Sequence, residues 1–107
     1  MSQQATKDPI LERFHAAGLA AYGARLDRMA PFGSRARGDA TPTSDYDIAV
    51  FLKDSGGLWR ESETLADLQT DILLGAGAVT NALPLPSEGY GERSPFMSEL
   101  RRDGREL

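Results

Sequence analysis

Hydrophobic positions along the chain follow two different periods, which divide it into helices and strands. Apolar residues recur at helical spacing in two long segments and in a short one near the end, and three short segments are dense in apolar residues. The predicted order is α-β-α-β-α-β-α. The segments are, in chain order, 9–22, 25–32, 34–38, 46–52, 58–74, 78–85 and a last helix that starts at Ser94-Pro95 and ends before Gly104.

Capping residues mark the ends of the two long helices. Asp8 is a suitable N-cap, and Pro9 suits the first helical position. Glycine commonly follows a helix, so Gly23 is predicted to end the first helix. Gly75 and Gly77 are predicted to end the long helix that starts at residue 58.

The segment Tyr46–Leu52 is a nearly continuous apolar run, which predicts a central strand covered on both faces. Side chains alternate across a strand, so Ala49 and Phe51 should lie on the same face as Asp47. The other face is predicted to carry Tyr46, Ile48, Val50 and Leu52. The next strand contains Pro84 and ends before Pro86, which places it at an edge of the sheet or makes it short.

The long helix combines an apolar stripe with a charged face. The stripe consists of Leu58, Leu65, Leu68 and Ile72. The residues expected to face water are Arg60, Glu61, Glu63, Asp67 and Asp71. With helices packed on a small mixed β-sheet, the fold class is α/β (α+β), in stacked layers.

Length and composition restrict the class of protein. A chain of 107 residues indicates one domain over residues 1–107, with residues 1–7 expected to be flexible. No apolar run approaches 18 residues, and the first residues lack a signal-peptide pattern, so a cytoplasmic protein without a membrane span is expected. The absence of Cys and the single His15 exclude thiolate sites and multi-histidine zinc centres within the chain.

The charge pattern favours a small anionic ligand over a long polyanion. The formal net charge is −4, whereas nucleic-acid binders usually present a basic face. Positive residues instead cluster in one part of the sequence, at Arg25, Arg28, Arg35 and Arg37. Direct nucleic-acid binding is therefore not expected.

Two carboxylates open the central strand. Asp45 and Asp47 are two residues apart, so both should point to the same face of the sheet. Carboxylates this close repel each other unless a cation lies between them, and Mg²⁺ prefers carboxylate oxygen. Asp45 and Asp47 are therefore the candidate catalytic and metal-binding residues.

A phosphate-binding turn is predicted just before this strand. Gly33 permits close approach of a ligand to the backbone, and Ser34 opens a short helix whose first amide groups can bind phosphate. Arg35 and Arg37 add guanidinium groups that suit phosphate oxygens, and Ser44 directly precedes the first aspartate. These five residues are the candidate nucleotide- and phosphate-binding set.

Gly33-Ser34, ten residues and then Asp45-x-Asp47 resemble the signature of the DNA polymerase beta-type nucleotidyltransferase superfamily. The fuller pattern GSRARG…SDYDIAVFL is similar to its smallest branch, the minimal nucleotidyltransferases. The resemblance implies a nucleotidyltransferase fold and transfer of a nucleoside monophosphate, expected to be AMP from ATP, to a hydroxyl. It also implies two Mg²⁺ ions, with Mn²⁺ as an alternative, held by the two aspartates.

The family pattern includes a third carboxylate on the next strand, which this sequence lacks. Asn81 is the nearest polar residue on that strand, and its amide oxygen could ligate a metal but is a poor base. Glu88 or a carboxylate from a partner could fill the gap.

The resemblance also implies a partner. Minimal nucleotidyltransferases commonly pair with a helical HEPN-type protein, in some cases a toxin that is neutralised when AMP is transferred to a tyrosine. We therefore expect an antitoxin-like enzyme. Two alternatives remain open, namely a weakly active or inactive subunit that binds nucleotide or partner, and an antibiotic-type transferase acting on a small molecule. The sequence also leaves open a homo-oligomer.

Overall fold

A computed structural model describes residues 8–33, 37, 41, 44–53 and 58–103. The side chains of residues 58, 59 and 103 are not among those described. The described elements are α1 (Pro9–Tyr22), the 3₁₀ turn η1 (Gly23–Arg25), β1 (Leu26–Phe32), β2 (Tyr46–Leu52), α3 (Leu58–Ala76), β3 (Thr80–Pro86), the 3₁₀ turn η2 (Ser87–Gly91) and α4 (Pro95–Asp103). The predicted helix over 34–38 lies outside these residues, apart from Arg37.

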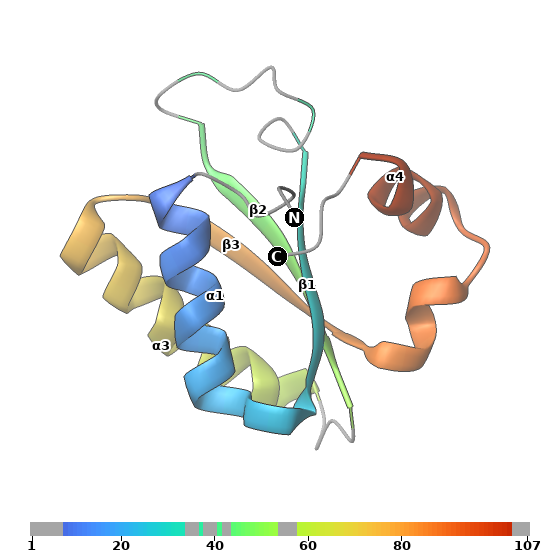
Figure 1. Cartoon of the computed structure of the whole chain (residues 1–107), viewed down its shortest axis with the longest axis horizontal. Helices are drawn as coiled ribbons and strands as arrows, with labels where there is room; N and C mark the ends of the chain where they lie inside the picture. Colours follow the sequence, from blue (N-terminus) through green and yellow to red (C-terminus); the bar gives the residue numbers. More distant parts are fainter. Residues whose placement is uncertain (1–7, 34–36, 38–40, 42–43, 54–57, 104–107) are drawn as a thin grey trace, which may run out of the picture.

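The three strands form one mixed sheet in the order β1-β2-β3, with β2 in the centre (Figure 1). β1 pairs with β2 in antiparallel orientation, and β3 pairs with β2 in parallel. The parallel connection is made through α3, as a crossover requires. The predicted mixed α/β fold, the central position of β2 and the edge position of β3 are confirmed.

The ends of the helices follow the capping signals closely, with one exception. Asp8 accepts a hydrogen bond from the Ile10 N–H at 2.9 Å, and Gly23 ends α1 with φ +58°. The prediction that Gly75 ends the long helix is wrong, because α3 continues to Ala76. Gly77 ends it instead, since it adopts φ +74° and its N–H bonds the Leu73 carbonyl, an arrangement in which glycine has no Cβ to strain.

The two faces of β2 pack against different layers. Ile48, Val50 and Leu52 are buried against the layer of α1 and α3, which Figure 1 shows on one side of the sheet. Ala49 and Phe51 are buried against Met97 and Leu100 of α4 on the other side. The predicted division of β2 into two faces is confirmed. α4 covers only part of the second face, and Asp45 and Asn81 on that face are exposed.

One predicted surface residue lies in the interior. Glu61 of α3 was expected to face water, but it is 1% exposed and forms an ion pair with Arg25. A buried carboxylate needs such a partner, and Arg25 supplies it from the end of η1, directly before β1. Arg25 precedes β1 and Gly33 follows it, so the two residues lie at opposite ends of the strand.

Arg28 is also away from that end of the strand, because its guanidinium lies over the Tyr90 ring, 3.7 Å from the ring centroid. Arg25 and Arg28 thus cluster with Arg35 and Arg37 in the sequence, but their side chains contact Glu61 and Tyr90.

Candidate functional site

Asp45 and Asp47 lie on the same face of the sheet, where both contact one side chain. The amide nitrogen of Asn81 lies 3.4 Å from Oδ2 of Asp45 and 3.3 Å from Oδ1 of Asp47. A single amide group can donate to both carboxylates because both point to its side of the sheet. The same-face arrangement expected from the spacing is present.

The register of β2 and β3 produces this cluster. Asp47 is paired with Asn81 across the parallel strands, and Asp45 directly precedes β2. Alternation along each strand then directs all three side chains to one face. Asp45 and Asn81 are exposed and Asp47 is half-buried, so the cluster is open to a ligand from solvent.

Gly33 lies close to the Asp47 carboxylate and directly follows β1, the other strand that pairs with β2. It directly follows Phe32, which is paired with Asp47 across β1 and β2. A Cβ on Gly33 would lie 2.8 Å from Oδ2 of Asp47, and the residue has φ +74°. Both observations require glycine here. Asp47 is therefore placed between Gly33 on the β1 side and Asn81 on the β3 side.

Of the other predicted phosphate-binding residues, Arg37 and Ser44 are among those described. Ser34 and Arg35 lie outside the described residues. Arg37 is exposed. Its backbone N–H donates to the Gly33 carbonyl at 3.0 Å, with the four-residue spacing of an α-helical hydrogen bond. The Ser44 hydroxyl accepts from the Thr41 N–H at 2.9 Å and so shapes the loop before Asp45.

Glu88 does not fill the place of the third carboxylate. It belongs to η2, which follows the far end of β3, whereas Asn81 lies near the start of that strand (Figure 1). The intervening strand spans roughly 16 Å at the usual rise per residue. Asn81 is thus the polar β3 residue paired with Asp47.

The donor set fits an open site for a divalent ion. Mg²⁺ is usually held through one or two carboxylates together with substrate phosphates and water. Asp45 and Asp47 supply two carboxylates, and the Asn81 amide could turn its oxygen towards an ion. Among the described residues, no group of three or more acidic, His or Cys side chains is arranged to hold a metal. The chain therefore offers part of a coordination shell, which phosphate oxygens would complete.

Sequence reasoning missed a contact that fixes the start of β2. The Tyr46 hydroxyl donates to Oδ2 of Asp8 at 2.8 Å, while the other oxygen of Asp8 caps α1. The residue between the two aspartates is thereby tied to the first helix. No local signal predicts a contact between residues 38 positions apart.

Comparison with known families matches residues 20–84 to the sequence model of the nucleotidyltransferase domain. The matched segment includes Gly33, Asp45, Asp47 and Asn81. A search of curated proteins finds no match. Structural comparison aligns the chain with a candidate nucleotidyltransferase from Sulfolobus solfataricus at a TM-score of 0.56 and 16% identity, covering 97% of this chain and 90% of that one. A likeness at this identity shows a shared fold. Within the described residues, no helix is both long and apolar enough to cross a membrane.

Proposed function

This chain belongs to the nucleotidyltransferase domain family, and we propose that it transfers AMP from ATP to a tyrosine hydroxyl of a helical HEPN-type partner protein. In this proposal the partner is a toxin, and the transfer neutralises it. The observation that carries the transfer reaction is the placement of the Asp47 carboxylate between Gly33 and Asn81, with Asp45 on the same face.

Each residue of this cluster has a task in the proposed reaction. Gly33 lacks a side chain, so phosphate oxygens can approach the backbone beside Asp47. Asp45 and Asp47 would hold divalent metal, which supplies positive charge to the phosphates when bound. Asn81 orients both carboxylates through its amide, which restricts their rotation before a ligand arrives.

The partner is proposed because the described fold leaves the carboxylate cluster uncovered. The described fold consists of the sheet and its covering helices, and the carboxylate cluster lies on an exposed face. A helical partner could cover that face and bring the acceptor hydroxyl to the aspartates, which would also exclude water from the reaction.

The test uses ATP labelled at either the α- or the γ-phosphate, together with Mg²⁺ and total protein of the cells that encode the chain. We expect a protein to acquire the α label and not the γ label, with AMP found on a tyrosine by mass spectrometry. Asp47→Asn should abolish the labelling. Asp67→Asn, at an exposed position of α3, should leave it unchanged. Absence of α label with both Mg²⁺ and Mn²⁺, or transfer of the γ label, would contradict the proposal.

A second candidate function is nucleotide binding without turnover, and Asn81 is the observation that favours it. An amide is a poor base, and it adds no charge to the metal site. Under this alternative, calorimetry would detect ATP binding while no pyrophosphate is released in the presence of the partner. Release of pyrophosphate would exclude this alternative.

A further inference from the structure

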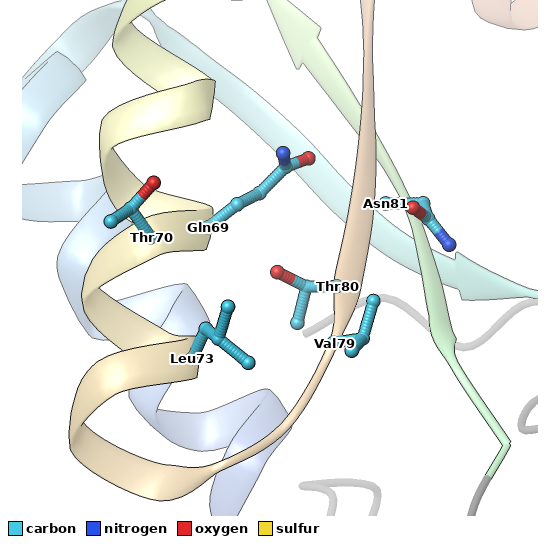
Figure 2. Close-up of a pocket in the computed structure, with 6 residues that line it drawn as sticks. All are labelled: Gln69, Thr70, Leu73, Val79, Thr80 and Asn81. Atoms are coloured by element: carbon cyan, nitrogen blue, oxygen red, sulfur yellow. The ribbon is translucent and has the colours of Figure 1, made fainter.

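Tyr46 lies between the two aspartates in the sequence, but its side chain points to the opposite face of the sheet. It is paired with Thr80 across β2 and β3, and paired residues share a face. Figure 2 shows Thr80 directed towards α3 and Asn81 directed to the other side of β3, where its amide contacts both aspartates. The pocket drawn there, between β3 and α3, is also on the face away from the aspartates. Tyr46 is 6% exposed in the core of that face, so it can act on the aspartates only through the backbone of β2.

The start of β2 has fewer strand contacts than its middle. Among the described residues, the pairing of β1 with β2 ends at Phe32 and Asp47. One residue earlier, the Tyr46 N–H donates to the Val79 carbonyl at 2.9 Å, which joins the chain to the β3 side. Asp45 precedes the strand and is exposed. At this point the described strands thus pair with β2 from one side, and a further contact is required to fix the position of the segment.

The hydroxyl of Tyr46 supplies this further contact. It donates to Oδ2 of Asp8 at 2.8 Å, and a carboxylate acceptor makes such a hydrogen bond stronger than one between neutral groups. Asp8 is itself fixed at the start of α1, because its other carboxylate oxygen accepts from the Ile10 N–H at 2.9 Å. Its carbonyl also accepts from the Glu12 N–H at 3.0 Å. The N-terminus of α1 therefore holds the start of β2 from the face opposite the aspartates.

We propose that Asp8 and Tyr46 are positioning residues for a divalent metal ion. Their hydrogen bond holds the backbone between Asp45 and Asp47 before the ion arrives, so less conformational freedom is lost when both carboxylates bind it. The inference rests on the proposed function, because it requires that the two aspartates bind metal. Linkage adds a second consequence. If the contact between Tyr46 and Asp8 increases metal affinity, bound metal must stabilise that contact by the same factor.

The first test measures the Mn²⁺ affinity of the full chain by electron paramagnetic resonance titration. Tyr46→Phe removes the hydroxyl and keeps the ring, and it should weaken Mn²⁺ binding about three- to tenfold. Asp8→Ser retains an N-cap for α1 but has no second oxygen for Tyr46, so it should weaken binding by a similar factor. The double variant should lose no more affinity than either single variant, because both substitutions remove the same contact.

Tyr22→Phe is the matched control for Tyr46→Phe. Tyr22 is also 6% exposed, and its hydroxyl donates from α1 to the Glu61 carbonyl of α3, away from the aspartates. Tyr22→Phe should therefore keep the Mn²⁺ affinity of the wild type, and melting curves verify that every variant is folded at the temperature of the titration. Equal weakening in Tyr22→Phe and Tyr46→Phe would overturn the inference, because a general loss of stability would then explain both.

Amide hydrogen exchange of the ¹⁵N-labelled chain measures the reverse effect. Saturating Mg²⁺ should slow exchange of the Ile10 amide, which the Asp8 carboxylate caps, several-fold in the wild type and not in Tyr46→Phe. The Lys53 amide donates to the Arg25 carbonyl at the other end of β2, and its exchange rate should stay unchanged. Slowing of the Ile10 amide by the same factor in wild type and Tyr46→Phe would contradict the positioning role.

The same titrations separate this inference from the proposed function. Wild-type chain that binds no Mn²⁺ would contradict the metal site, and with it both the proposed function and the positioning role. Mn²⁺ binding by the wild type, combined with unchanged affinity in Tyr46→Phe and Asp8→Ser, would overturn the positioning role alone and leave the metal site at the two aspartates in place.

Discussion

Asn81 stands opposite Asp47 on the neighbouring parallel strand, with its amide nitrogen 3.3 Å from Oδ1 of that carboxylate. The same amide contacts Asp45, so two negative charges on one face are bridged by a neutral donor. This arrangement partly offsets the repulsion between the carboxylates without a cation. Under the proposed metal binding, Asp45 and Asp47 would be the two charged ligands, and Asn81 would add no charge.

Asn81→Asp is therefore expected to strengthen metal binding. A third carboxylate adds attraction for a divalent ion, and affinity at oxygen sites depends on the number of charged ligands. We expect Mn²⁺ to bind on the order of tenfold more tightly, a change of about 1.4 kcal/mol. Electron paramagnetic resonance titration of free Mn²⁺ measures the affinity.

Asn81→Leu is the matched control, because it removes the amide without adding charge. Its Mn²⁺ affinity should not exceed that of the wild type. The metal-free Asn81→Asp chain should melt at a lower temperature than the wild type, since three carboxylates then face one another without a donor. Equal Mn²⁺ affinity in Asn81→Asp and wild type would contradict a metal site at Asp45 and Asp47.

Gly33→Ala is expected to act in two separable ways. At φ +74°, any side chain costs about 1 kcal/mol of folding free energy, and a Cβ here would also lie 2.8 Å from Oδ2 of Asp47. The variant should therefore lose stability and, because Asp47 must move, bind Mg²⁺-ATP more weakly.

Gly77→Ala provides the matched control for Gly33→Ala. Gly77 has the same φ of +74°, and nothing lies within 4 Å of the position of its Cβ. Urea unfolding should show a loss of about 1 kcal/mol in Gly77→Ala with unchanged ATP binding. If the two variants lose ATP affinity equally, the contact between Gly33 and Asp47 has no functional role.

The parts of the fold that local sequence determines were predictable. Asp8 and Gly23 lie at the ends of α1 because capping depends on residues that are adjacent in the chain. β2 was predicted with its observed bounds because a strand buried on both faces must be apolar throughout. The shared face of Asp45 and Asp47 follows from strand alternation alone.

Features that depend on distant partners were not predictable. Glu61 has the sequence context of a solvated helix residue, and only its ion pair with Arg25, 36 positions away, explains its burial. The contact between Asn81 and the aspartates depends on the register of two parallel strands, which periodicity does not specify. The choice between Gly75 and Gly77 as the end of α3 depended on which of them adopts positive φ.

Tyr22 is expected to make stability depend on alkaline pH. Burial, and then the negative charge of Glu61, raise the pKa of the Tyr22 hydroxyl above its usual value of 10.0. Between the unfolded and the folded pKa, the unfolded state has lost a proton that the folded state retains, so unfolding becomes more favourable as pH rises. The contribution of Tyr22 is thus complete below pH 10 and is lost above it.

The measurement is urea unfolding of wild type and Tyr22→Phe at pH values from 8 to 11. Tyr22→Phe removes the titrating hydroxyl and its hydrogen bond to the Glu61 carbonyl. The free energy of unfolding of the wild type should fall more steeply above pH 10 than that of the variant. Parallel curves over the whole range would show that Tyr22 does not titrate differently in the two states.

The ion pair between Arg25 and Glu61 is expected to contribute measurably to stability. The Glu61 side chain is 2% exposed, and that of Arg25 is 39% exposed. Removing the arginine therefore leaves the Glu61 carboxylate buried without this guanidinium. Because Arg25 itself is partly in contact with water, the pair is only half buried. Breaking a fully buried pair costs about 3–5 kcal/mol, and the exposure of Arg25 reduces the expected loss to about 2 kcal/mol for Arg25→Met. Arg60→Met, at an exposed position of α3, should cost less than about 0.5 kcal/mol.

The double variant Arg25→Met/Glu61→Met should recover most of the loss, because no charge then remains buried. Urea unfolding of the wild type, Arg25→Met, Glu61→Met and the double variant gives the coupling free energy, and additive losses in the double variant would contradict the pairing.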